Sequence, residues 1–298
     1  MKCLLIYFTG TYNTRYVSRK LKSRLEEVGW QVNLYEIDPL NNGRLNLSEY
    51  DIIGLGYPIH GYCAPWAFLR FIRAQKFPEG MKTFIYKNSG ETERANDASS
   101  KYVLRKLRRD GAVMNNEYHF LMPYNIHFRF DDNLVKEMLV MNDRLLDILV
   151  YELCHGISNR KPYGIWPRIV SSVVSRPQYI GGDVNSFFYR VDDKCTGCNL
   201  CVKNCPTKNI RRDADGKLCF GHHCLMCMRC SFYCPVDAIH IGFLEQWGWK
   251  VNGGYDFRKI EAIELDHPVI TPYTKGFFHC YIDTYEKINK RHKELFGD

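Results

Sequence analysis

The segments 195-CTGCNLCVKNCP-206 and 224-CLMCMRCSFYCP-235 share one cysteine spacing, Cys-x2-Cys-x2-Cys-x3-Cys-Pro. An iron–sulfur cube needs four thiolates at its corners, and three cysteines in one short loop reach three of its irons without strain in the backbone. The fourth cysteine of each run lies too far along the chain to reach the same cube. The proline after it has a fixed φ and no amide hydrogen, so it turns the chain away. The spacing therefore predicts an iron–sulfur module in the second half of the chain.

These two runs resemble the ligand pattern of bacterial two-cluster ferredoxins, in which the fourth cysteine of each run binds the other cluster. The resemblance implies two [4Fe–4S] clusters with crossed ligation. One cluster would take Cys195, Cys198, Cys201 and Cys234, and the other would take Cys224, Cys227, Cys230 and Cys205.

Zinc and disulfides are the two alternatives for these cysteines. Zinc sites take four ligands, often as two separated pairs, and do not need three evenly spaced cysteines with a fourth before proline. A disulfide scaffold needs an oxidising compartment and is usually far smaller than 298 residues. We therefore favour clusters over both alternatives.

The composition is that of an ordinary globular chain. Its 298 residues suit two domains, and a hydrophobic content of 45% is enough for packed cores. No run approaches the roughly 20 apolar residues of a membrane span. The apolar start of the chain is too short for a signal peptide and lacks a cleavage site. Since the cysteines outside the two runs are scattered, as free thiols are, we predict a cytoplasmic protein without a membrane span.

Part of the net charge of +8 is concentrated on one predicted helix. Its basic residues are Lys101, Arg105, Lys106, Arg108 and Arg109. The simplest interpretation is a solvated helix face. The alternative is a docking patch for an acidic redox partner protein, because charge raises the rate of encounter. Nucleic acid is not expected as a partner, since no aromatic-interleaved basic motif accompanies these residues.

Strand and helix patterns alternate through the first half of the chain. Short apolar runs predict five strands, at 2–8, 32–37, 51–55, 83–86 and 112–121. Apolar residues at helical spacing predict intervening helices, including those at 65–74 and 95–109, and a long closing helix at about 134–149. This alternation predicts an α/β domain with a five-stranded, doubly wound parallel sheet covered on both faces.

The loop after the first predicted strand, 8-FTGTYNT-14, has the composition of a phosphate site. Threonine hydroxyls, an asparagine side chain and backbone amides gather at a helix N-terminus, where a phosphate dianion is stabilised. The loop has neither a Walker lysine nor a Gly-x-Gly-x-x-Gly motif, so it indicates a monophosphate rather than a nucleoside triphosphate or a dinucleotide. An ordinary capping turn is the alternative.

Two further loops should reach the same edge of the sheet. The segment 56-GYPIHGYCAPW-66 is aromatic and stiffened by proline, which suits contact with a flat ring. The segment 87-KNSGE-91 offers glycine and backbone amides to ring heteroatoms. Together with the threonine-rich loop, in this order, they predict a site for a phosphorylated flat cofactor.

The three loops resemble those of flavodoxins, and the resemblance covers the whole first half of the chain. Thr9, Gly10, Asn13 and Thr14 match the Thr-Gly-x-x-Asn-Thr loop of that family, which often has glycine at the position of Tyr12. The resemblance implies FMN, with its phosphate on Thr9, Gly10, Thr11, Tyr12, Asn13 and Thr14. Its isoalloxazine would lie between Pro58, Ile59, His60, Gly61 and Tyr62 on one side and Asn88, Ser89 and Gly90 on the other. The segment 122–127 would close over the flavin, with Tyr124 and His127 as neighbours, or form a surface loop.

The chain as a whole resembles the flavodoxin–ferredoxin fusion proteins of anaerobic bacteria and archaea. This predicts a flavodoxin-like domain at 1–158, a proline- and glycine-containing linker at 159–186 and a small α+β ferredoxin-like two-cluster domain at 187–245. The apolar residues at 165–174 are expected to pack on the first domain. Residues 246–298 form a C-terminal extension with a helix at 282–295, expected to cover one of the two domains.

We interpret the chain as an electron carrier that relays electrons between two [4Fe–4S] clusters, FMN and a redox partner protein. The first alternative is a flavin-dependent reductase of a quinone or enone, with His60, Tyr62, Tyr124 or His127 as the proton donor. The second alternative is a redox sensor, but no effector domain is recognisable. No nicotinamide-binding fingerprint is present, which disfavours direct oxidation of NAD(P)H.

Overall fold

The computed structural model describes residues 1–298 except 42, 93, 161, 249, 251–252 and 298, together with all side chains outside 176–179 in the remaining ranges. Within these ranges, no helix is both long and apolar enough to cross a bilayer.

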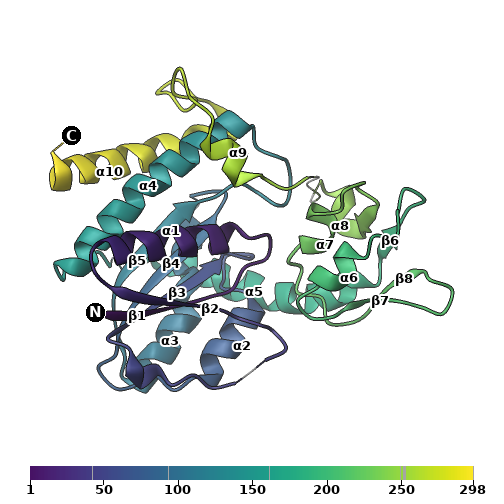
Figure 1. Cartoon of the computed structure of the whole chain (residues 1–298), viewed down its shortest axis with the longest axis horizontal. Helices are drawn as coiled ribbons and strands as arrows, with labels where there is room; N and C mark the ends of the chain where they lie inside the picture. Colours follow the sequence, from purple (N-terminus) through teal and green to yellow (C-terminus); the bar gives the residue numbers. More distant parts are fainter. Residues whose placement is uncertain (42, 93, 161, 249, 251–252, 298) are drawn as a thin grey trace.

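Five parallel strands form the central sheet, in the order β2-β1-β3-β4-β5 (Figure 1). They are β1 (Lys2–Tyr7), β2 (Gln31–Glu36), β3 (Ile52–Pro58), β4 (Lys82–Ser89) and β5 (Val113–Leu121). This is the flavodoxin-like strand order of a doubly wound sheet. The order in which successive strands are added reverses between β1 and β3, although all the strands are parallel. The predicted fold class is confirmed, and the crevice in which such folds bind ligands lies beyond the carboxyl ends of β1 and β3.

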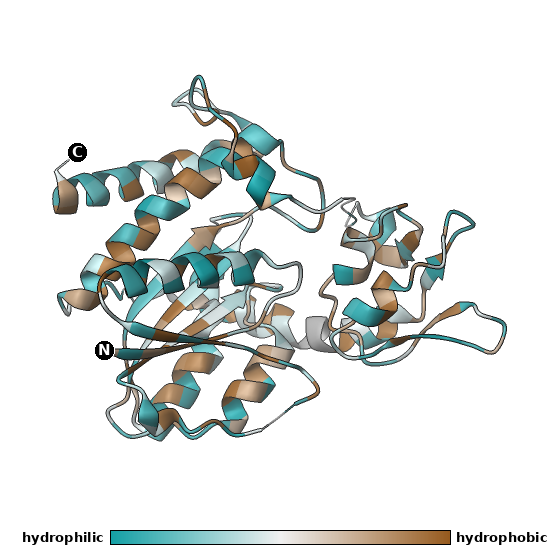
Figure 2. Cartoon of the chain, in the orientation of Figure 1, coloured by the Kyte–Doolittle hydropathy of each residue, from teal (hydrophilic) through white to brown (hydrophobic). Residues whose placement is uncertain are grey.

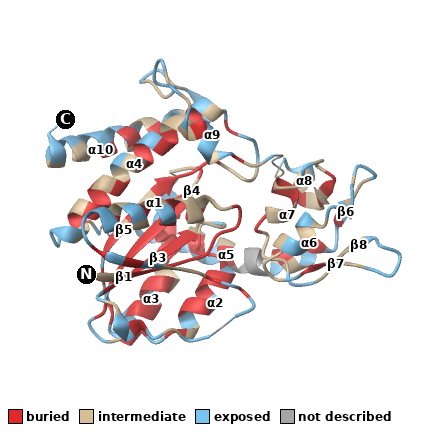
Figure 3. Ribbon diagram, viewed as in Figure 1, coloured by how far each residue is buried: buried red, intermediate tan, exposed pale blue. Residues whose placement is uncertain are grey.

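Helices cover both faces of the sheet. The helices α1 (Asn13–Glu27) and α4 (Asp132–Cys154) pack on one face, and α2 (Trp66–Ala74) and α3 (Lys101–Asp110) pack on the other. Because both faces are covered, the three inner strands β1, β3 and β4 are almost entirely buried, whereas the edge strands β2 and β5 are partly exposed (Figures 2 and 3). The two resulting apolar cores hold the sheet rigid beneath its loops.

The helix predicted at 95–109 begins differently from the prediction. A 3-10 segment, η2 (Arg94–Ser100), comes first, and α3 follows from Lys101. Gly111 ends α3 with φ +79, a conformation that glycine takes without steric penalty. Lys106 is not part of a basic surface, because it is buried and paired with Asp110 at 2.6 Å. The exposed basic residues of α3 are Arg105, Arg108 and Arg109, with Lys101 partly exposed.

The segment predicted as a linker forms a helix of 22 residues, α5 (Ile165–Ser186). It packs on η2 through small side chains, and Ser171 and Ser175 are fully buried. The expectation that the apolar residues of 165–174 pack on the first domain is wrong for Ile169 and Val173, which face solvent. The connection between the two halves is thus a packed helix with its apolar side outward.

The ferredoxin-like module follows α5 and consists of two similar halves. Its antiparallel pairs are β6 (Tyr189–Val191) with β9 (Ile239–Ile241) and β7 (Ile210–Arg212) with β8 (Leu218–Phe220). The short helices α6 (Leu200–Asn204) and α7 (Arg229–Phe232) begin at equivalent places, and each contains the third cysteine of its run. The helix α8 (Phe243–Gln246) closes the module. Figure 1 shows α7 on the side of the module that faces the sheet.

The C-terminal extension returns to the flavodoxin-like domain. It contains α9 (Phe257–Glu261), η3 (Gly276–Phe278) and α10 (His279–Phe296), and α10 lies along α4 (Figure 1). Glu261 accepts a hydrogen bond from Tyr16 and pairs with Lys20 on α1, each at 2.6 Å. The extension therefore covers the α1–α4 face of the first domain.

Candidate redox site

The eight cysteines of the two runs are free and gather in two groups. Cys195, Cys198, Cys201 and Cys234 line one cavity, and Cys230 reaches its wall. Burial raises the pKa of the Cys230 thiol, and its neighbours Cys227, Cys224 and Cys205 raise it further. Each group thus contains the fourth cysteine of the other run.

Left-handed backbone recurs at the same three places in both runs. The positions are Gly197 and Met226 (φ +73 and +49), Asn199 and Met228 (φ +61 and +58), and Lys208 and Asp237 (φ +55 and +52). Such a conformation costs a non-glycine residue roughly 1 kcal/mol or more, so it persists only where the surrounding structure enforces it. Its repetition shows that the two loops are wound in the same way.

Backbone amides point at the sulfur atoms of both fourth cysteines. The N–H of Asn209 donates to Cys205 Sγ at 3.2 Å, and the N–H of Ala238 donates to Cys234 Sγ at 3.3 Å. Hydrogen bonds of this kind stabilise thiolate ligands and tune the potential of a cluster. Within the described ranges, no three His, Cys, Asp or Glu side chains converge on one metal ion, whereas the ligands of a cube stand around four irons.

The loops after β1, β3 and β4 meet at Asn88. Thr14 Oγ1 donates to Asn88 Oδ1 at 2.7 Å, and the N–H of Ile59 donates to the Asn88 carbonyl at 2.8 Å. The loop after β5 joins them, because Asn125 donates to Thr11 Oγ1 at 3.0 Å and Asn13 donates to the Pro123 carbonyl at 2.8 Å. The structure therefore brings together the residues that the sequence placed in separate loops.

The loop after β1 has the features of a phosphate site. Thr9 Oγ1 is buried and has no hydrogen-bond partner among the described residues. Tyr12 precedes α1 with φ +73, which explains why glycine suits this position in flavodoxins. The first amides of α1 have no partner within the helix. An unpaired hydroxyl beside a helix N-terminus fits a phosphate monoester.

The loop after β4 is covered by an aromatic side chain. Gly90 packs so closely against the Tyr124 ring that a Cβ at this position would overlap the ring. Tyr281 of α10 donates a hydrogen bond to the Gly90 carbonyl. The ring of His127 lies 5.5 Å from that of Tyr124. A flat ring bound beside Gly90 would therefore have Tyr124 as its immediate neighbour.

The loop after β3 turns sharply. His60 and Cys63 exchange backbone hydrogen bonds of 2.9 and 3.0 Å, and Gly61 and Tyr62 between them have φ +49 and +59. Burial lowers the pKa of His60 to about 4. The imidazole is therefore neutral near pH 7, and it lines a cavity together with Cys224 and Leu225 of the second run.

The two modules touch directly at the phosphate-type loop. Arg229 Nε donates to the Gly10 carbonyl at 2.6 Å, and its Nη2 donates to the Thr9 carbonyl at 2.8 Å. Tyr233 Oη donates to the Thr11 carbonyl at 2.8 Å. The guanidinium also lies 4.8 Å from the ring centre of Tyr12, a cation–π contact. These bonds use the carbonyls of the loop and leave its amides for an anion.

Sequence reasoning missed Arg229 and Tyr233. The equivalent of Arg229 in the first run is Leu200, which is exposed. A comparison of the two runs position by position could therefore have pointed to Arg229, because the two runs differ at the position that contacts the first domain. The contact of Tyr281 with Gly90 comes from α10, and no sequence motif predicts it.

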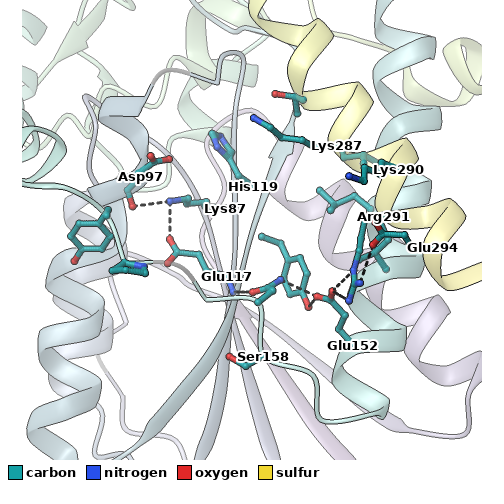
Figure 4. Close-up of a pocket in the computed structure, with 18 residues that line it drawn as sticks. Lys87, Asp97, Glu117, His119, Glu152, Ser158, Lys287, Lys290, Arg291 and Glu294 are labelled. Atoms are coloured by element: carbon teal, nitrogen blue, oxygen red, sulfur yellow. Dashed lines mark hydrogen bonds and ion pairs between the residues drawn. The ribbon is translucent and has the colours of Figure 1, made fainter.

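A separate cavity lies where β4 and β5 meet α10 (Figure 4). Its lining includes two ion pairs, Lys87 with Glu117 at 2.7 Å and Arg291 with Glu152 at 2.9 Å. Ser89, which was predicted beside the flavin ring, has its hydroxyl 2.7 Å from His119 Nε2 on the wall of this cavity. We assign no ligand here, because the protein neutralises these charges itself.

One family model matches a part of the ferredoxin-like module. Residues 188–211 match the family model of the 4Fe-4S binding domain. No curated protein matches the chain. The chain thus carries an iron–sulfur-binding domain beside a flavodoxin-like sheet, a combination that indicates a redox role.

Solved structures similar to this chain include several flavodoxins. Oxidised flavodoxin 1 from Bacillus cereus is 18% identical, with 48% of this chain and 95% of that chain covered and a TM-score of 0.37. A flavodoxin from the domain Archaea is 14% identical, with 52% of this chain and 100% of that chain covered and a TM-score of 0.34. General stress protein 14 from Treponema denticola, solved in complex with FMN, is 10% identical, with 51% of this chain and 99% of that chain covered and a TM-score of 0.39. The fold assignment rests on the strand order.

Proposed function

We propose that this chain is an electron-transfer protein that connects two [4Fe–4S] clusters with FMN and passes electrons on to a redox partner protein. The observation that carries the proposal is the contact between the second cysteine run and the phosphate-type loop, where Cys227 lies against Gly10. Both cofactor sites therefore share one wall. Clusters transfer single electrons, and FMN accepts two and releases them singly.

The proposed cluster ligands follow the two cysteine groups. Cys195, Cys198, Cys201 and Cys234 hold one cluster, and Cys224, Cys227, Cys230 and Cys205 hold the other. The cavity that Cys234 lines together with Cys195, Cys198 and Cys201 supports this division. The second cluster is the one nearer to the flavin, because its loop carries Cys227 and Arg229. Free thiols and clusters suit a reducing compartment.

The proposed flavin site uses the loops that meet at Asn88. Thr9 and the amides that open α1 hold the phosphate, while Tyr124 and the loop after β3 border the ring. The residues of the chain would bind and orient the flavin and exclude water from it. No proton donor is needed for the relay, and the neutral state of His60 near pH 7 gives the reductase alternative no charged donor at that position.

Anaerobic analysis of the purified holoprotein tests the proposal. We expect iron and acid-labile sulfide for two clusters, one FMN, and electron paramagnetic resonance signals of two interacting reduced clusters. The reduced protein should reduce a protein acceptor and should not turn over quinones or enones by itself. Zinc in place of iron, or steady turnover of a quinone, would contradict the proposal.

A further inference from the structure

Among the described side chains of α5, exposed apolar residues line one side of the helix. Seven exposed apolar residues fall on one stripe of the helix and its end: Ile165, Trp166, Ile169, Val173, Ile180, Val184 and Phe187. Trp166 is 69% exposed and Val173 and Ile180 are 65% exposed each. We call these residues the α5 stripe. Apart from the adjacent pair Ile165 and Trp166, they follow one another at three, four or seven residues, which places the set on one face about 100° wide.

The α5 stripe is unusual because the polar side of the same helix faces the protein. Ser171, Ser175 and Ser186 are fully buried, and Gly182 packs against the Cys224 carbonyl of the ferredoxin-like module. A surface helix normally does the reverse and buries its apolar side. The small buried side chains let α5 lie close to η2, which leaves the apolar stripe to be covered by something outside the chain.

Arginines gather at the N-terminal end of the stripe. Burial and the charge of Glu117 raise the pKa of Tyr163, and the charges of Arg168, Arg108 and Arg160 lower it in part. Lys101 donates to the Arg168 carbonyl at 3.2 Å and to Ser172 Oγ at 2.5 Å, which fastens α3 to the border of the stripe. Arg105 follows Lys101 by one turn of α3 and is exposed. We call Arg105, Arg108, Arg160 and Arg168 the arginine border.

We propose that the α5 stripe and its arginine border bind the surface of an anionic lipid bilayer. An amphipathic helix with Trp and branched apolar residues on one side and basic residues beside them lies in the plane of such a surface. The apolar stripe enters the headgroup boundary, and the arginines meet lipid phosphates. Trp166, next to the arginine border, is the residue type that prefers this depth.

Charge favours lipid over a second copy of this chain. Two α5 helices packed antiparallel would offer the arginine border a single carboxylate of the helix, Asp183. An anionic bilayer offers charge along the whole border and an apolar layer beneath the stripe. Because α5 ends against the Cys224 loop, the proposed orientation also keeps the second cluster close to the membrane surface.

Vesicle flotation of the anaerobic holoprotein tests the proposal. We expect binding to vesicles of phosphatidylglycerol and phosphatidylcholine and at least tenfold weaker binding to phosphatidylcholine alone. Binding should weaken as salt rises, because exposed charges are screened. The double variant I169S/V173S should lose at least tenfold of the binding, whereas V113S/V140S, which changes exposed apolar residues elsewhere, should keep it.

The arginine border is tested in the same way. R105Q/R160Q should weaken binding to anionic vesicles, and R211Q/R258Q, with an equal change of charge at exposed positions elsewhere, should weaken it less. All four variants should retain the thermal unfolding midpoint of the parent, since every substituted side chain is exposed. Failure of the parent to bind anionic vesicles, or equal binding by I169S/V173S, would overturn the proposal.

Light scattering without lipid completes the test. A parent protein that is dimeric, with I169S/V173S monomeric, would show that a second copy covers the stripe and would also overturn the proposal. Neither outcome depends on cofactor content, so this inference can fail while the proposed electron transfer stands.

Discussion

The carbonyl oxygen of Cys227 lies 2.9 Å from the point that a Cβ on Gly10 would occupy. Real Cβ atoms do not approach oxygen so closely, and the oxygen belongs to backbone that cannot rotate away. The docking of the ferredoxin-like module on the first domain therefore requires glycine at this position. The contact joins a loop that follows a buried strand to a loop that carries cluster ligands.

Replacement of Gly10 should loosen this docking. We expect G10A to lower the unfolding midpoint and to expose the joints around the module to protease, because the added methyl pushes the two loops apart. Gly181 in α5 has nothing near its Cβ position, so G181A should be neutral or stabilise by up to about 1 kcal/mol. Calorimetry with limited proteolysis checks both, and identical behaviour of the two variants would contradict the interpretation.

Arg229 should act as the clamp between the modules. R229A loses hydrogen bonds to the Gly10 and Thr9 carbonyls, and we expect it to destabilise the protein by about 2–3 kcal/mol, the usual range for charge-assisted bonds. R229K should rescue only part of this, because an ammonium cannot make both bonds in one plane. Urea unfolding measures the change. R211A removes an exposed arginine of the same module and should change little.

The proposed ligand assignment predicts different outcomes for cysteines inside and outside the two runs. C205S and C234S should each lower the iron and sulfide content by about half, since each removes one ligand of one cluster. In both variants the interaction between two reduced clusters should disappear from the electron paramagnetic resonance spectrum. C219S should keep the full content, because Cys219 lies on β8 outside both groups. Loss of iron in C219S alone would refute the assignment.

Thr9 offers a test that separates flavin binding from folding. In T9V a methyl replaces a buried hydroxyl that lacks a partner, so the flavin-free protein should be as stable as the parent or slightly more stable. If the hydroxyl binds the phosphate, FMN affinity should fall about tenfold or more. Fluorescence titration with FMN measures the affinity. Unchanged affinity with raised stability would place the phosphate elsewhere.

Two partly buried histidines should make the protein sensitive to mild acid. Burial lowers the pKa of His60 to about 4, and burial together with Lys87 lowers that of His119 to about 3. The unfolded chain binds these protons near pH 6.5, so stability should be full above pH 7 and fall as the pH drops below about 6.5. Thermal unfolding from pH 8 to 5 checks the slope, which H119Q should flatten.

The cysteine groups were predictable because ligand geometry is set within a few residues of chain. The sheet was predictable for a similar reason, since strands buried on both faces are continuously apolar. The spacing of Ile169 and Val173 indicates an apolar face but does not say which face packs, and here Ser171 and Ser175 face the protein. The prediction that Lys106 belongs to a basic helix face was also wrong, because Lys106 is buried in an ion pair with Asp110.

The contacts between modules could not be predicted in this way. Arg229 meets Gly10 across 219 residues of sequence, and no local pattern encodes such a distance. The aromatic packing of Tyr124 with Phe277 depends equally on how the extension folds back. Local rules therefore predict the candidate ligands of each half, and only the folded chain shows how one half lies against the other.

The ferredoxin-like module is held from both sides, by α5 before it and by the extension that returns to α1 and α4 after it. The module is therefore expected to keep its position against the first domain. The rate of electron transfer between the proposed clusters and FMN should then be independent of solvent viscosity. A module that had to diffuse between a donor and an acceptor would show the opposite.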